Sequence, residues 1–112
     1  MIDAQTIDLE SLQASAGEAT DLLKALSNPH RLLVLCQLEA GEMQVAQLQA
    51  GSGLSQSALS QHLARLREDG LIAARREGVA VFYRIANPAA LKVIGVLAEI
   101  YCPPRRYRSS SP

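Results

Sequence analysis

Aromatic residues are scarce in this sequence of 112 residues, which has no tryptophan, one phenylalanine and three tyrosines. A hydrophobic core must therefore be built from leucine, isoleucine, valine and alanine. Uninterrupted apolar runs are only a few residues long, which argues against a membrane-spanning helix. Residues 1–5 lack the basic and apolar regions of a signal peptide, so we expect a cytoplasmic protein.

Cysteine is also scarce, with only Cys36 and Cys102. Cytosolic thiols are kept reduced, which argues against a purely structural disulfide. Two thiolates alone leave a tetrahedral metal ion short of ligands. The sequence also lacks a Cys-x-x-Cys motif and a glycine-rich loop after a strand. We therefore predict no cofactor, no metal site and no catalytic residues, which leaves a small thiol redox enzyme as the weakest alternative.

The net charge is zero, but the charges are unevenly distributed. Residues 1–53 carry seven acidic and two basic residues, a net charge of −5, whereas residues 54–112 carry nine basic and four acidic residues, a net charge of +5. A polyanion responds to the local field, so a neutral total does not exclude nucleic acid as a partner. The alternative is that the two halves simply attract each other.

The length predicts a single domain over 1–112, with 1–8 and 103–112 as flexible tails. Apolar spacing and start and stop signals predict five helices, over about 9–26, 29–39, 44–50, 55–69 and 88–101. Asn28-Pro29 and Asn87-Pro88 each supply an N-cap followed by proline, and Ser55 is a third expected N-cap. Gly51-Ser52-Gly53 is expected to break the third helix, and the second is apolar enough to be buried.

After Gly70 the period changes, and 71–76 and 81–85 are predicted to be strands joined by a four-residue connection over 77–80. The protein is therefore mainly α with a two-stranded β-hairpin. This order of elements, with a tight Gly-Ser-Gly turn between two helices and a basic hairpin after them, is typical of a winged helix-turn-helix.

In a helix-turn-helix the second helix lies in the major groove, and its N-terminal residues contact base edges. Here that helix follows Ser55, and its predicted outward positions are Gln56, Ser57, Ser60, Gln61 and His62. Gln can pair with adenine, and Ser adapts to either base. The alternative is an ordinary solvated face, but this one carries no acidic residue before Glu68. Arg65 is placed to contact phosphate.

His62 has no second histidine nearby in the sequence, so we assign it to a phosphate or base contact rather than to a metal. The hairpin supplies Arg75 and Arg76 for the minor groove or its phosphates, and Gly78 allows close approach of the backbone. The alternative is an edge hairpin protected by charge.

These features resemble the ArsR/SmtB-type winged-helix repressors over about residues 18–101. The resemblance is carried by three stretches: 23–32 (LKALSNPHRL), 54–63 (LSQSALSQHL) and 66–72 (LREDGLI). It implies a homodimer built on the first and last helices, which binds an inverted-repeat operator in double-stranded DNA and represses transcription until an inducer arrives.

Most members of this family sense metals, but the two metal sites are absent from this sequence. The positions of the family's cysteine pair are Gln44 and Ala46, and residues 88–101 offer Glu99 but no histidine. Cys36 and Cys102 instead resemble the persulfide-sensing BigR/SqrR-type branch and the related HlyU-type regulators. That resemblance implies that reactive sulfur species bridge the two cysteines and release the operator. A general oxidant acting through a plain disulfide, and arsenite or another thiophilic ligand, are the alternatives.

Overall fold

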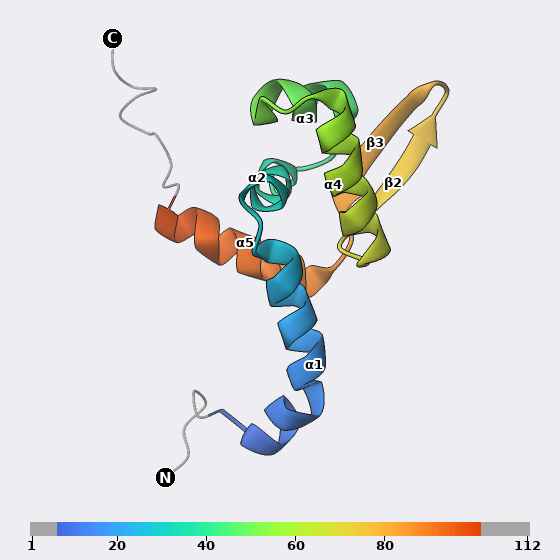
Figure 1. The fold of residues 1–112 in the computed structure, drawn as a ribbon. Coiled ribbons are helices and arrows are strands. Elements are labelled where there is room, and N and C mark those ends of the chain that lie inside the picture. Colours follow the sequence, from blue (N-terminus) through green and yellow to red (C-terminus); the bar gives the residue numbers. More distant parts are fainter. Residues whose placement is uncertain (1–6, 102–112) are drawn as a thin grey trace.

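The computed structural model describes residues 7–101, and Cys102 with the rest of the predicted C-terminal tail lies outside that range. The chain forms α1 (Leu9–Leu26), α2 (Pro29–Leu38), β1 (Met43–Gln44), α3 (Val45–Ser52), α4 (Gln56–Glu68), β2 (Ile72–Glu77), β3 (Ala80–Ile85) and α5 (Pro88–Tyr101). Figure 1 shows the β2–β3 hairpin projecting beyond the helices and α1 extending away from them. The predicted winged helix-turn-helix with five helices is confirmed.

The N-caps form where the sequence predicts them. The Asn28 side chain accepts hydrogen bonds from the backbone N–H groups of His30 (2.9 Å) and Arg31 (3.1 Å). Ser55 Oγ accepts from Ala58 N (3.1 Å), and Asn87 Oδ1 accepts from Ala89 N (2.8 Å). Each cap satisfies amide groups that the first helical turn leaves without partners.

Asp8 also caps a helix, although the sequence assigned it to the N-terminal tail. Its carboxylate accepts from the backbone N–H groups of Glu10 (3.1 Å) and Ser11 (3.4 Å). Its other oxygen accepts from the Ser11 hydroxyl (2.8 Å). These hydrogen bonds favour the charged carboxylate, and the largest of them, from the Ser11 side chain, lowers the pKa of Asp8.

The sheet has one strand more than predicted. The short strand β1 pairs with β3, which also pairs with β2, so that the antiparallel order is β1-β3-β2. Gln44, predicted to be helical, belongs to β1, and its backbone N–H donates to Gln47 Oε1 (2.9 Å) at the start of α3. A two-residue strand is too short to show the alternation by which strands are found in a sequence.

Two predicted turns differ in detail. α3 continues through Gly51 and Ser52 and ends at Gly53, whose φ of 71° lies in the left-handed region that favours glycine. The connection between β2 and β3 has two residues rather than four, because Glu77 pairs with Ala80. Gly78 has φ 63° and Val79 has a negative φ, the combination of a type II′ hairpin turn.

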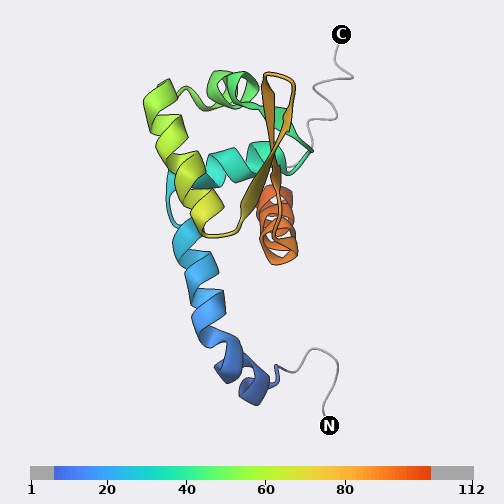
Figure 2. The same cartoon turned by 90° about the vertical axis from the view of Figure 1, so that its right-hand side faces the viewer.

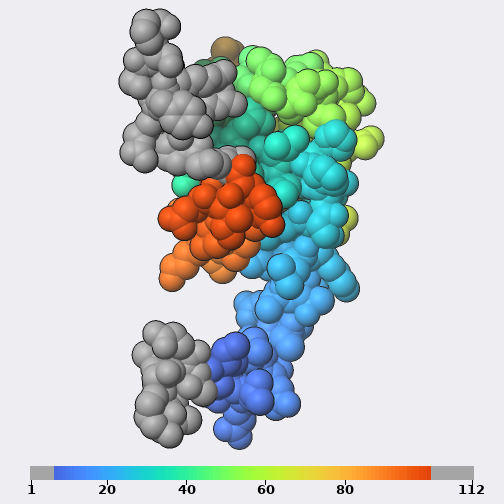
Figure 3. All heavy atoms as spheres, turned by 90° about the vertical axis from the view of Figure 1, so that its left-hand side faces the viewer, coloured from blue at the N-terminus to red at the C-terminus, as the bar shows by residue number. Residues whose placement is uncertain are grey.

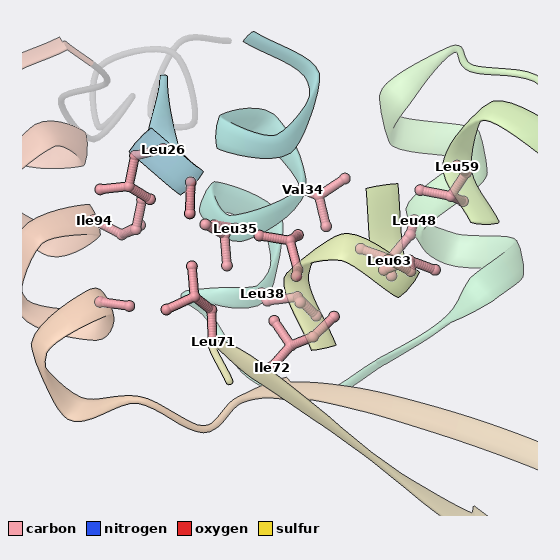
Figure 4. Close-up of a cluster of buried hydrophobic side chains, with 13 residues drawn as sticks. Leu26, Val34, Leu35, Leu38, Leu48, Leu59, Leu63, Leu71, Ile72 and Ile94 are labelled. Atoms are coloured by element: carbon pink, nitrogen blue, oxygen red, sulfur yellow. The ribbon is translucent and has the colours of Figure 1, made fainter. Parts of the chain in front are cut away.

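The core lies around α2, which contacts all four other helices and β3. Figure 4 shows Leu35 and Leu38 of α2 among side chains from α1, α4, β2 and α5. The sequence predicted that α2 is buried, but Leu33 is 51% exposed. The buried residues are Ala25, Leu26, Val34, Leu35, Leu38, Leu48, Leu59, Leu63, Leu66, Leu71, Ile72, Ala90 and Ile94.

Apolar side chains also remain on the outside of α1 and α5. Figure 2 shows the first half of α1 reaching away from the other elements, and residues 9–21 are all exposed. α5 lies at the surface beside α2 in Figure 3. The large apolar residues exposed on these two helices are Leu9, Leu12, Leu23, Leu91, Val96, Ile100 and Tyr101. No helix within residues 7–101 is long and apolar enough to cross a membrane.

Candidate nucleic-acid interface and cysteine site

α4 separates a buried stripe from a polar outer face. Leu59, Leu63 and Leu66 point into the core with at most 3% of their surface exposed. The four predicted base-reading residues Gln56, Ser57, Ser60 and Gln61 are all exposed. Because Ser55 fixes the start of α4 and Gly53 ends α3 just before it, these side chains lie on the first two turns of a well-anchored helix. Among the described residues, none of the four side chains forms a hydrogen bond.

His62 is less exposed than the sequence predicts, because α2 packs beside it. Its ring centroid lies 5.7 Å from that of His30, which is at the N-terminus of α2. Burial is the largest cause that lowers the pKa of His62, followed by the positive charge of Arg31 and by His30. His62 therefore has a second histidine as a spatial neighbour. Their separation of 32 positions in the chain hid that contact from sequence reasoning.

Arg31 has a structural role at this corner. Its Nε donates to the backbone oxygen of Ala25 (2.9 Å), and a terminal nitrogen donates to that of Lys24 (3.3 Å). The guanidinium thus binds two carbonyl groups in the last turn of α1, where the helix runs out of backbone N–H donors. This contact joins the start of α2 to the end of α1.

Two of the predicted phosphate-binding arginines already have carboxylate partners. Arg65 Nε donates to Asp69 Oδ2 (3.0 Å) at the C-cap of α4, and both side chains are substantially exposed. Arg75 is held by Glu42, whose two oxygens accept from its Nε at 2.9 Å each. Arg76, on the next position of β2, is exposed and forms no ion pair within residues 7–101. Gly78 lies at the hairpin turn, as predicted.

Cys36 lies on α2, half-buried against the core. The other predicted sensing residue, Cys102, lies outside the described residues. It directly follows Tyr101, the last residue of α5, and α5 contacts α2. The structure thus brings the helix that carries Cys36 against the helix that precedes Cys102.

The described part of the chain contains no group of three or more His, Cys, Asp or Glu side chains that could hold a metal ion. The His30–His62 pair accordingly has no third ligand of these types among residues 7–101.

The exposed face of α4, whose first two turns carry no acidic residue, the preceding short helix and the arginine-bearing hairpin define a DNA-binding transcriptional regulator of the winged helix-turn-helix class. Residues 28–74 match the model of the bacterial regulatory protein, arsR family. The chain is 42% identical to the transcriptional activator HlyU of Vibrio cholerae over 96 residues, which cover 86% of this chain and 89% of the relative. It belongs to the ArsR family of bacterial regulatory proteins, as the sequence motifs predicted.

Solved structures agree with this assignment. The transcriptional repressor BigR from Xylella fastidiosa has a TM-score of 0.80 and 38% identity, with 86% of this chain and 98% of that one covered. The homodimeric winged helix-turn-helix domain Mb0332 from Mycobacterium bovis has a TM-score of 0.68 and 30% identity, with coverages of 88% and 89%. BigR is described as a transcriptional repressor and the Mb0332 domain as a DNA-binding domain.

Proposed function

We propose that this protein is a homodimeric repressor that binds an inverted-repeat operator with α4 in the major groove. The observation that carries this proposal is the exposed face of α4, where Gln and Ser side chains extend from the first two turns with no acidic residue among them. Such side chains form hydrogen bonds to base edges, and a helix fits the major groove. Gln56, Ser57, Ser60 and Gln61 read bases, and Ser55 and His62 lie at the margin of that contact.

The hairpin contacts the DNA backbone. Arg76 is exposed and available for phosphate, and Gly78 at the turn lets the backbone approach closely. Arg65 and Arg75 must first loosen their carboxylate partners, Asp69 and Glu42. Phosphate contacts of this kind fix the register of the protein on DNA without reading sequence.

The dimer forms through α1 and α5. Both helices expose large apolar side chains, among them Leu12 (44% exposed) and Val96 (54% exposed). Exposed apolar surface of this extent on a small regulator marks an interaction site. The homodimeric state of Mb0332, which shares this fold, supports the same arrangement here. Two α4 helices about one helical turn of DNA apart would then face two half-sites, ~10 bp centre to centre.

Reactive sulfur species release the operator through Cys36 and Cys102. One thiolate attacks a sulfane sulfur of a polysulfide, gains that sulfur as a persulfide and expels the shortened polysulfide. The second thiolate then attacks a sulfur of the persulfide chain, and hydrosulfide leaves. Both thiols are oxidised and the polysulfide is reduced. With one added sulfur, the attack is on the first cysteine's own sulfur and the bridge is a plain disulfide. Where the first cysteine has gained two sulfurs, attack on the inner added sulfur expels hydrosulfide and leaves a bridge that contains one added sulfur.

The contact between α2 and α5 supports this switch, because Cys36 lies on α2 and Cys102 directly follows α5. A covalent bridge between the two would tie the core helix to a helix of the proposed dimer interface. It would thereby change the spacing of the two α4 helices. Such a regulator acts where its DNA lies, in the cytoplasm.

The test uses an operator selected by the wild-type protein from a library of random-sequence duplexes, with binding measured by fluorescence anisotropy. Reduced wild type should bind, and polysulfide should weaken binding by about 5–150-fold, a typical coupling between two sites. Cys36→Ser and Cys102→Ser should bind equally well but not respond to polysulfide, and a reductant should restore binding by wild type. If polysulfide releases Cys36→Ser from the operator as readily as it releases wild type, the two-cysteine bridge is contradicted.

Intact-mass measurements identify the inducer class. Wild type is exposed separately to polysulfide, peroxide and arsenite, and the mass and operator affinity are recorded for each. The proposal predicts that polysulfide weakens operator binding by about 5–150-fold. Release by peroxide alone, with the mass of a plain disulfide, would indicate a general oxidant sensor instead. Release by arsenite alone would indicate a thiophilic-ligand sensor.

A further inference from the structure

Arg75 and Glu42 form an ion pair between distant segments of the chain. Arg75 lies in β2, and Glu42 lies in the loop between α2 and β1, 33 positions earlier. Both Glu42 oxygens lie 2.9 Å from Arg75 Nε, and a terminal nitrogen of Arg75 lies 2.9 Å from Glu42 Oε1. In these charge-assisted hydrogen bonds the carboxylate accepts from the same guanidinium N–H groups that would donate to a phosphate group.

The path of the Arg75 side chain crosses the sheet. Arg75 pairs with Phe82 of β3 in the strand register, and its guanidinium carbon lies 4.5 Å from the centre of the Phe82 ring. β3 lies between β2 and β1, so Arg75 reaches over the central strand to the carboxylate beside β1. The aromatic face and the carboxylate together hold the guanidinium against the sheet.

The surroundings of Arg75 also stabilise its charge. The hydrogen bond that Arg75 donates to Glu42 is the largest cause that raises the pKa of Arg75, and the charges of Glu42 and Glu77 add to it. Glu77 is a weaker partner, since its carboxylate lies 3.5 Å from Arg75 and is 71% exposed. The neighbouring Arg76 forms no ion pair within the described residues. Arg76 therefore presents its charge to an approaching polyanion, whereas the charge of Arg75 is partly neutralised by Glu42.

We infer that Glu42 limits the affinity of the hairpin for DNA, because it weakens sequence-independent binding by occupying the guanidinium of Arg75. This inference rests on the proposed contact between the wing and the DNA backbone. Backbone phosphates carry no sequence information, so every arginine available to them strengthens binding to all DNA alike. Glu42 competes with phosphate for Arg75 and thereby lowers the sequence-independent part of the binding free energy. A larger share of the binding free energy then comes from the base-reading face of α4.

The experiment compares Glu42→Gln with wild type on a random-sequence duplex and on the selected operator, between about 50 and 200 mM salt. Glutamine keeps an oxygen that accepts from Arg75 but removes the charge. Glu42→Gln should bind the random duplex severalfold more tightly, with a salt dependence steeper by about 0.9 in log–log slope, the value for one more phosphate contact. The operator affinity should rise by the same factor, so that the ratio of operator to random affinity stays unchanged, because the added contact is to phosphate.

Glu39→Gln is the matched control, because Glu39 is exposed three residues earlier and forms no ion pair within residues 7–101. It changes net charge equally and should leave the slope and the random-duplex affinity unchanged. In Arg75→Gln the further change Glu42→Gln should no longer steepen the slope. Glu42→Ala, with circular dichroism and urea unfolding of each variant, provides a second test in which the fold is verified.

The outcomes separate this inference from the proposed function. A folded Glu42→Gln variant with the slope and the random-duplex affinity of wild type would overturn the role of Glu42 alone, as would an equal gain in Glu39→Gln. If Arg75→Gln changes neither affinity nor slope in the Glu42→Gln background, the contact of Arg75 with phosphate is wrong. Wild type that binds neither duplex would contradict the DNA-binding function itself.

Discussion

Gln61 is an exposed side chain in the second turn of α4, on the face opposite Leu59 and Leu63. If it reads a base edge, Gln61→Ala should cost about 1–3 kcal/mol of operator affinity and relax the preference at one operator position. The measurement is anisotropy titration against the operator, a set of single-base variants and a random duplex. Equal losses on all of these duplexes would contradict base reading and indicate a general contact.

His62 gives the stability of the protein a pH dependence. Burial first, and then Arg31 and His30, lower its pKa below the ordinary value of 6.5, so near and below that pH the unfolded chain binds more protons than the folded one. The free energy of unfolding should therefore fall as the pH drops from neutral through 6.5 to the folded-state pKa. Urea unfolding of wild type and His62→Gln across this range checks it.

His62→Gln removes the titrating group, so its free energy of unfolding should fall less than that of wild type as the pH drops. Both proteins would lose stability in parallel if other groups were responsible. His30→Gln is the informative companion variant, because it removes a neighbour that lowers the pKa of His62 while leaving His62 in place.

Among the elements, α1 has the least support from its own chain, because residues 9–21 are exposed along its N-terminal part. Its C-terminal end is anchored by the buried Ala25 and Leu26 and by Arg31, which binds the backbone oxygens of Lys24 and Ala25. An isolated helix is marginally stable in water, and packing of an apolar face supplies most helical stability in proteins. A partner subunit covering Leu9 and Leu12 would supply it here.

Leu12→Asp should therefore weaken the dimer with little effect on the fold of each subunit, because Leu12 is 44% exposed in the single chain. Burying a leucine contributes about 1.5–3 kcal/mol, so its loss should raise the dimer dissociation constant at least tenfold. Sedimentation of Leu12→Asp at several concentrations measures this. Gln13→Asp, at the next helical position, is the charge-matched control, and a Leu12→Asp dimer as stable as wild type would refute the α1 interface.

At the scale of the whole molecule, one helix holds the parts together. α2 contacts the four other helices and β3, and Leu35, which is fully buried, lies near its middle among residues of α1, α5 and β2 (Figure 4). α4, β3 of the hairpin, α1 and α5 are thus attached to the same central element. A strain applied to α2 at Cys36, one residue from Leu35, would act on all of them.

Leu35→Ala should destabilise the fold by about 2–5 kcal/mol, because it leaves a cavity that its neighbours fill only in part. Leu33→Ala removes the same atoms from the same helix at a position that is 51% exposed, and should change stability by no more than about 0.5 kcal/mol. Urea unfolding at a fixed protein concentration compares the two. Equal losses would show that α2 is not packed on the side that contains Leu35.

The sequence alone predicted the helices, the caps at Asn28, Ser55 and Asn87, the order of elements and the family. These features depend on signals within a few residues: an Asn-Pro pair, a glycine after an apolar stripe, or a change of period from helix to strand. The outer face of α4 was predictable for the same reason, since the buried positions Leu59, Leu63 and Leu66 fix which side chains point outward.

Tertiary structure decided which distant groups meet. It placed His30 beside His62, brought Glu42 to Arg75, added β1 to the sheet and left Leu33 outside the core. Periodicity shows which face of an element is apolar, but the neighbour that covers that face depends on how all the elements pack. From the sequence, the charge of Arg75 on an exposed strand therefore predicted a contact with phosphate. In the fold, the Arg75 guanidinium pairs with the carboxylate of Glu42, which comes from another segment of the same chain.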